Sequence, residues 1–125
     1  MKATLVGHSC LRVETRAGTI LVDPWLFGSC YWRSWWHYPP STPPDDAMLA
    51  PDWIYLTHHH FDHFHYPSLR AIDKGASVLI PRFGVDVMAA EVTGLGFDPP
   101  TELRHGHIVE LGDGVRVASY QYGFD

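Results

Sequence analysis

The sequence has little cysteine and no long hydrophobic run. Its two cysteines, Cys10 and Cys30, form neither a C-x-x-C motif nor a disulfide framework, so free buried thiols are the simpler interpretation. No stretch approaches the roughly 20 uninterrupted apolar residues of a membrane span. The apolar start of the chain breaks at Gly7, too early for a signal peptide. We therefore expect a cytoplasmic protein that does not associate with membranes.

Basic residues are also few, with 9 Lys and Arg against 14 Asp and Glu and a formal net charge of −5. They are scattered along the chain, whereas nucleic-acid binding requires a basic stripe. A small molecule is therefore the expected partner. The content of 46% hydrophobic and 18% charged residues is ordinary for a folded protein, and 125 residues suffice for one domain, residues 1–125.

Hydrophobic periodicity predicts a mixed α/β arrangement with hairpins at both ends. Two helices are expected, over Ser68–Lys74 and over the segment from Val85 to Val92. Gly112-Asp113-Gly114 is expected to form a hairpin turn. Strands are expected at 5–6, 10–14, 19–22, 53–56, 77–80, 102–104, 108–111 and 115–120.

A long loop is expected over residues 25–51, and loops of this length in compact domains are usually functional. Seven aromatic residues fall between Trp25 and Tyr38. They could cap the core. Alternatively, Trp32, Arg33, Trp35 and Trp36 could form a substrate wall, with Arg33 offering a charge for a phosphate or carboxylate.

Histidine is unusually frequent, and five of the nine histidines lie between positions 58 and 65. The segment Thr57–His63 contains the spacing H-x-H-x-D-H directly after an expected buried strand. In an extended or tightly turned segment, positions i and i+2 point to the same side. We therefore expect His58, His60, Asp62 and His63 to bind a metal such as Zn²⁺, Fe or Mn. A solvated histidine-rich loop would not explain why the cluster follows a buried strand.

The other histidines carry weaker expectations. His59 and His65 are expected in outer or solvated roles, and His105 and His107 as turn residues. For His8, in Gly7-His8-Ser9, a structural hydrogen bond and a role in the site are equally supported.

These motifs resemble a known family. Asp23-Pro24 after one strand and Thr57–His63 after another look like the first two motifs of the metallo-β-lactamase superfamily. Gly7-His8-Ser9 and Gly112–Val117 are similar to its ascorbate-6-phosphate lactonase-like branch. The aromatic and proline-rich segments after Asp23, together with Tyr66–Leu69, are similar to the lactamase-like domain of the CMP-N-acetylneuraminate hydroxylases.

The resemblance implies roles for the motif residues. His58 and His60 would bind a first zinc ion, and Asp62 and His63 a second, with a bridging water between the two ions. Asp62 would also orient the nucleophile and act as the catalytic residue. Asp23 would fix the geometry of the ligands, although an Asp-Pro pair can also serve only as a turn.

The resemblance also implies a four-layer αβ/βα sandwich built from two similar halves, of which this chain corresponds to the first. The expected fold is thus an apparently truncated half-sandwich. A third histidine would fall near Gln121, where the residue is glutamine. We expect the missing ligands from a second half or from another copy of the chain, because a half-sandwich exposes a sheet face.

Three functions follow as expectations. The first is a metal-dependent hydrolase that acts on a small anionic ester, lactone or phosphorylated substrate. The second is an iron-dependent hydroxylase resembling the CMP-N-acetylneuraminate branch. The third is a non-catalytic fragment or scaffold that needs a second half to complete its metal site.

Overall fold

The computed structural model describes residues 1–85 and 87–121, and it confirms the mixed α/β fold. Six strands form one sheet in the order β1-β2-β3-β6-β7-β8. Strand β2 pairs antiparallel with both β1 and β3, and β3, β6, β7 and β8 run parallel. Their bounds are β1 Lys2–Gly7, β2 Cys10–Thr15, β3 Gly18–Val22, β6 Trp53–Tyr55, β7 Ser77–Pro81 and β8 Thr101–Leu103.

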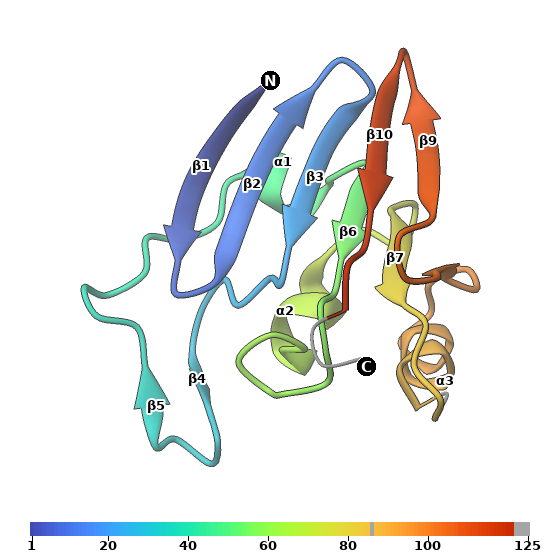
Figure 1. Ribbon diagram of the computed structural model, residues 1–125. Coiled ribbons are helices and arrows are strands. Elements are labelled where there is room, and N and C mark those ends of the chain that lie inside the picture. The colour runs from blue at the N-terminus through green and yellow to red at the C-terminus, as the bar shows by residue number, and fades with distance from the viewer. Residues whose placement is uncertain (86, 122–125) are drawn as a thin grey trace.

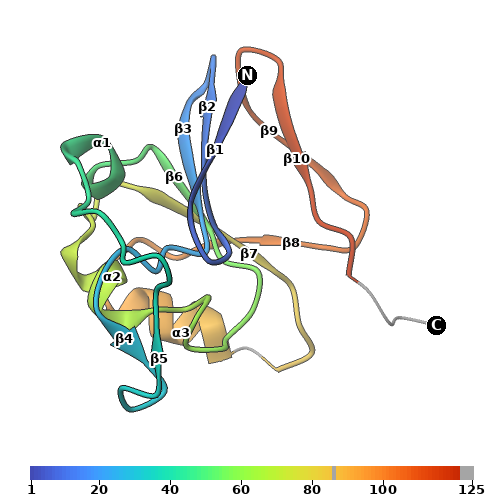
Figure 2. The same ribbon diagram turned by 90° about the vertical axis from the view of Figure 1, so that its left-hand side faces the viewer.

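The three helices of the described residues lie on one face of this sheet (Figure 2). They are α1 (Asp46–Leu49), α2 (Tyr66–Ala71) and α3 (Val87–Gly94). The hydrophobic core lies between this face and the helices, with side chains such as Leu21, Ile54 and Leu69 almost completely buried. None of the helices in the described part of the chain is long and apolar enough to cross a membrane.

A separate hairpin lies against the other face of the sheet (Figures 1 and 2). It consists of β9 (Ile108–Gly112) and β10 (Val115–Ala118), as the sequence predicted. Asp113, at the predicted turn, has a positive φ of 49°. A cavity of about 220 Å³ remains between hairpin and sheet, with Ile20 and Val117 among its mainly apolar lining residues. The hairpin therefore covers this face only in part.

The loop after β3 is more ordered than predicted. It contains a short hairpin, β4 (Ser29–Cys30) with β5 (Trp35–Trp36), and the helix α1. Positive φ values at Tyr31, Trp32 and Arg33 turn the chain between β4 and β5. Glycine or asparagine usually signals such a conformation, and neither occurs at these positions.

Helix α2 begins and ends earlier than predicted, because His65 caps its first turn. The His65 Nδ1 accepts from the backbone N–H of Ser68, and Pro67 fits the first turn. The Lys74 ammonium then donates to the carbonyls of Leu69 and Ile72 near the helix end. Helix α3 buries Met88 and Val92 of the predicted set, but it begins at Val87, so Val85 precedes it and is 74% exposed. Asp86 lies outside the described residues.

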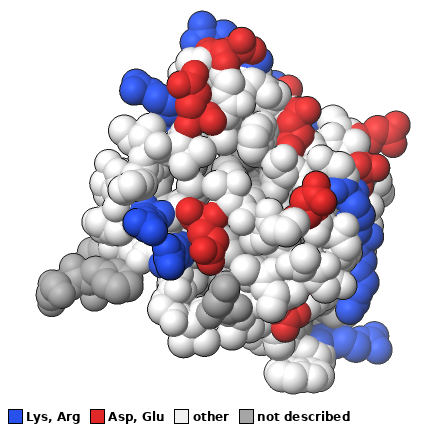
Figure 3. Space-filling view, turned by 90° about the vertical axis from the view of Figure 1, so that its right-hand side faces the viewer, with Lys and Arg blue, Asp and Glu red and all other residues white. Residues whose placement is uncertain are grey.

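The surface carries charged side chains of both signs. On the face shown in Figure 3, basic and acidic groups are interspersed and separated by uncharged surface. The basic groups on this face are not confined to one stripe, in keeping with their scattered positions in the sequence.

Candidate metal centre

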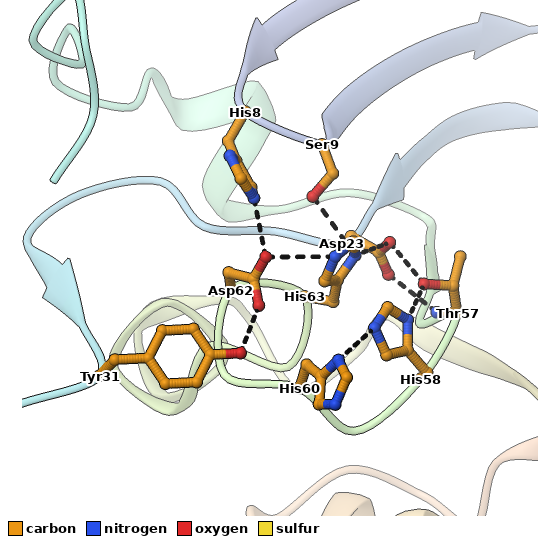
Figure 4. A network of polar contacts seen from close by, with 9 residues as sticks. All are labelled: His8, Ser9, Asp23, Tyr31, Thr57, His58, His60, Asp62 and His63. Carbon is orange, nitrogen blue, oxygen red and sulfur yellow. Dashed lines mark hydrogen bonds and ion pairs between the residues drawn. The ribbon is translucent and has the colours of Figure 1, made fainter. Parts of the chain in front are cut away.

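Two parallel strands end side by side and bring the two sequence motifs together. Strand β3 ends just before Asp23, and β6 ends just before the turn that carries the histidines. The Asp23 N–H donates to the carbonyl of Tyr55 at 2.9 Å, and Asp23 has a positive φ of 44°. Its carboxylate accepts hydrogen bonds from the backbone N–H and the hydroxyl of Thr57, at 2.8 and 2.6 Å. Asp23 thus fixes the start of the histidine turn (Figure 4).

His58 and His60 face each other, as the i, i+2 spacing predicted. The His58 Nε2 lies 3.0 Å from the His60 Nδ1. Two ligands of a tetrahedral zinc ion, each at ~2.0–2.1 Å, stand roughly 3.3 Å apart, so this separation fits a shared ion. The Thr57 hydroxyl gives its proton to Asp23 and therefore accepts from the His58 Nδ1 at 2.9 Å. This leaves the lone pair of His58 on Nε2, toward His60.

Burial lowers the pKa of His58, and the neighbouring rings of His63 and His60 lower it further. The ring centroids of His58 and His63 are 4.0 Å apart. The neutral imidazole is the form that binds metal ions, and this environment favours the neutral form of His58.

His63 is also oriented through its Nδ1. Its Nδ1 lies 2.7 Å from the Asp23 carboxylate, which can only accept, so the ring donates there and carries its lone pair on Nε2. That Nε2 lies 3.3 Å from the Asp62 Oδ2. A lone pair and a carboxylate oxygen repel each other at this distance unless a cation or a proton lies between them. Asp62 and His63 therefore form a second pair of converging donors (Figure 4).

Asp62 also has two partners that were not assigned to it from the sequence. The Tyr31 hydroxyl donates to its Oδ1 at 2.7 Å, and the His8 Nε2 lies 2.8 Å from its Oδ2. Burial alone would raise the pKa of Asp62, but the hydrogen bonds from Tyr31 and His8 outweigh burial and lower it to about 2. Asp62 is therefore ionised across the whole neutral range.

The aromatic loop divides into a buried part and an exposed part. Trp25 is 2% exposed, lies against the rings of His8 and His37, and caps the core. Trp32, Trp35 and Trp36 are 87%, 49% and 57% exposed, so core capping does not explain them. Trp35 is 6.2 Å from His8 between ring centroids, which brings this loop to the rim of the centre. The substrate wall, including exposed Arg33, stays a prediction.

The remaining candidates lie in structural contacts. His59 turns to the Tyr66 hydroxyl at 3.1 Å. His65 is buried as the cap of α2 and accepts from the Ser68 hydroxyl at 2.8 Å. His105 accepts from the backbone of Gln121, whose side-chain amide donates to the carbonyl of Arg82 at 2.8 Å. The amide of Gln121 is therefore engaged with the backbone after β7.

Known proteins are similar to this chain in sequence and in fold. The family described as "Beta-lactamase superfamily domain" matches residues 2–122. A Mycobacterium tuberculosis protein that carries the name of a Rieske 2Fe-2S iron-sulfur protein is 40% identical over 99 residues, which are 78% of this chain and 19% of the relative. The cytidine monophosphate-N-acetylneuraminic acid hydroxylase of Danio rerio is 37% identical over 73 residues, 57% of this chain and 12% of the enzyme.

A solved structure agrees in fold. The isothiocyanate hydrolase from Delia radicum gut bacteria matches with a TM-score of 0.68 at 23% identity, over 93% of this chain and 46% of the hydrolase. This chain thus spans about half of that fold and about a fifth of the mycobacterial relative. The chain belongs to the metallo-β-lactamase superfamily.

Proposed function

We propose that this chain carries the first half of a metal-dependent hydrolytic site. His58 and His60 hold one divalent ion, for which zinc is the first candidate, and Asp62 and His63 hold a second. One observation carries the proposal: both pairs of donor atoms stand 3.0–3.3 Å apart while Thr57 and Asp23 hold the opposite nitrogens of His58 and His63. Outer partners of this kind orient the ligands of metal sites.

The donors are nitrogen and carboxylate oxygen, which suit Zn²⁺ and also Fe and Mn. A bound zinc ion lowers the pKa of a water ligand until hydroxide exists near neutral pH. The chain's own residues then orient that nucleophile: Asp62 stays ionised, and Tyr31 fixes its carboxylate through Oδ1. Asp62 is therefore the proposed catalytic residue.

The proposed substrate is a small anionic ester, lactone or phosphorylated compound. Arg33 is exposed and offers a positive charge, and its sequence neighbours Trp32 and Trp35 expose flat apolar rings. Guanidinium groups pair well with phosphate and carboxylate. A hydrolytic reaction is also supported by the isothiocyanate hydrolase that shares the fold.

The second candidate is an iron-dependent hydroxylase. It is favoured by the hydroxylase of Danio rerio and by the mycobacterial relative named for an iron-sulfur protein. Metal content and oxygen dependence separate the two candidates. Zinc or manganese with turnover in the absence of oxygen supports the hydrolase, whereas iron with oxygen-dependent turnover supports the hydroxylase.

The direct test is a calorimetric titration of the chelator-treated chain with Zn²⁺. We expect two ions per chain, a stoichiometry near one for His58→Ala, and weakened binding at the other position for Asp62→Ala. The matched control is His107→Ala, which removes an exposed histidine in the loop before β9. If the wild type binds no zinc, the chain is a scaffold whose site needs its second half. If both variants bind like the wild type, the ligands are wrongly assigned.

A further inference from the structure

His8 reaches the centre from a part of the fold that the proposed function does not use. It lies in the turn between β1 and β2, with a positive φ of 52° that few non-glycine residues adopt. Its Nε2 lies 2.8 Å from the Asp62 Oδ2, and one donor atom each of His8, Asp62 and His63 lie within 4.8 Å of one another. Three side chains from two distant segments thus converge (Figure 4).

Two of the three converging side chains, Asp62 and His63, are held by other groups on the side away from the point of convergence. Tyr31 holds the Oδ1 of Asp62 and leaves Oδ2 toward the group. Asp23 holds the Nδ1 of His63 and leaves Nε2 toward it. Ser9, next to His8, also lies 3.3 Å from the His63 Nδ1.

The ring of His8 is held by aromatic packing. Trp25 lies edge-on at 5.3 Å between ring centroids, and Trp35 at 6.2 Å. About a third of the His8 side chain remains exposed, at 36%, so ions can reach it from solvent. The ring is thus positioned before any ion binds, which lowers the entropy cost of binding.

We infer that His8 is a third ligand of the ion held by Asp62 and His63, through its Nε2. This inference rests on the proposed function, because it presupposes that the Asp62–His63 pair binds a metal. A third ligand at this position also determines which of the two metal positions binds an ion first. The position with three ligands from this chain fills before the His58–His60 pair, which offers two. The chain can therefore hold one divalent ion without donors from a second half.

The test uses Zn²⁺ alone on the whole chain and follows the tighter binding event. His8→Ala should weaken the first ion roughly 10- to 100-fold, a loss at least as large as that from removing an outer partner of a ligand. His58→Ala should leave the first ion within about threefold and remove the second. His107→Ala serves as the control variant.

A second variant separates ligation from positioning. Glutamine at position 8 can still donate a hydrogen bond to Asp62 but lacks the imidazole, so His8→Gln should bind as weakly as His8→Ala. Recovery of the first ion in His8→Gln would overturn the inference and make His8 a hydrogen-bond donor only.

A measurement of zinc binding on the wild-type chain does not depend on whether the variants fold. Imidazole ¹⁵N NMR should show the Nε2 signal of His8 shifting with the first equivalent of zinc, together with that of His63 and ahead of His58. A His8 signal unchanged at one equivalent would overturn the inference while leaving the proposed function intact. The proposed function fails separately if no zinc binds or if none of the four motif residues affects binding.

Discussion

At the scale of single residues, Asp23 connects the two pairs of proposed ligands. Its Oδ2 contacts the Thr57 hydroxyl at 2.6 Å and the His63 Nδ1 at 2.7 Å. Because the Thr57 hydroxyl also fixes the tautomer of His58, one buried carboxylate orients a ring in each pair. The Asp-Pro turn and the orienting role, which the sequence left as alternatives, are therefore compatible.

Asp23→Ala should consequently impair both positions. We expect zinc affinity to fall by roughly 10- to 100-fold, because both rings lose their orienting partner. The part-buried N–H of Thr57 also loses its acceptor, which should lower the free energy of unfolding by about 1–3 kcal/mol. Calorimetric titration and urea unfolding measure the two effects.

The matched control for Asp23→Ala is Asp52→Ala. Asp52 also accepts a backbone hydrogen bond, from the N–H of Thr19 at 2.7 Å, but it lies at the opposite end of β3. This control should lose stability and keep zinc affinity. Equal zinc affinity in Asp23→Ala and the wild type would refute the orienting role.

Residue patterns predicted much of the centre but not all of it. The H-x-H-x-D-H spacing and the Asp-Pro pair after a strand indicated His58, Asp62 and Asp23. The contact of Tyr31 with Asp62 left no such signal, since it depends on a left-handed turn without glycine at positions 31–33. His8 was visible only as a histidine in a turn, and its partner lies 54 residues away.

At the scale of elements, a buried hydroxyl joins α2 to the loop after β3. The Ser68 hydroxyl donates to the His65 Nδ1 at 2.8 Å and accepts from the N–H of Leu26 at 2.9 Å. The His65 Nε2 in turn lies 3.2 Å from the carbonyl of Ser29. This network fixes both ends of the segment that leads from Asp23 to Tyr31.

Ser68→Ala should destabilise the protein by about 1–3 kcal/mol, because it leaves the buried N–H of Leu26 without an acceptor and His65 without its donor. Urea unfolding should show a lower midpoint at an unchanged slope. The control Ser77→Ala changes an exposed serine at the start of β7 and should shift stability by less than about 0.5 kcal/mol. Equal midpoints for the two variants would contradict the role of this network.

Element prediction succeeded where a pattern had a clear period. The central strands read as apolar runs, and the turn at Asp113 is flanked by glycines. Hydrophobic periodicity did not predict the elements within residues 25–51, because β4, β5 and α1 are too short to show a period. Only the cap Asp45, which accepts from the Met48 N–H at 2.9 Å, follows a common helix-start pattern.

At the scale of the whole molecule, the sheet is covered by helices on one face and by a single hairpin on the other (Figure 2). Val6 packs against the core, so its neighbour Leu5 points to the hairpin side, where it is 67% exposed. The resemblance predicted this half-sandwich. The partial cover by β9 and β10 depends on long-range packing that sequence periodicity does not encode.

We propose that the open face associates with a second half or with another copy of the chain. Sedimentation velocity of the wild type should show self-association that increases with concentration, and Leu5→Lys should shift it toward the monomer. Tyr38→Lys, at an aromatic residue 98% exposed in the long loop, is the control. A wild type that stays monomeric at every concentration would contradict self-association.

The central claim is that imidazole and carboxylate groups converge on a metal position after β3 and β6. X-ray absorption at the zinc edge of the zinc-loaded chain tests it most directly. Burial raises the pKa of Cys10 to about 12 and also raises that of Cys30, which disfavours the thiolate form of both residues. We predict only nitrogen and oxygen ligands, at about 2.0–2.2 Å, with imidazole scattering beyond them. Sulfur ligands at about 2.3 Å, or no imidazole contribution, would contradict the account.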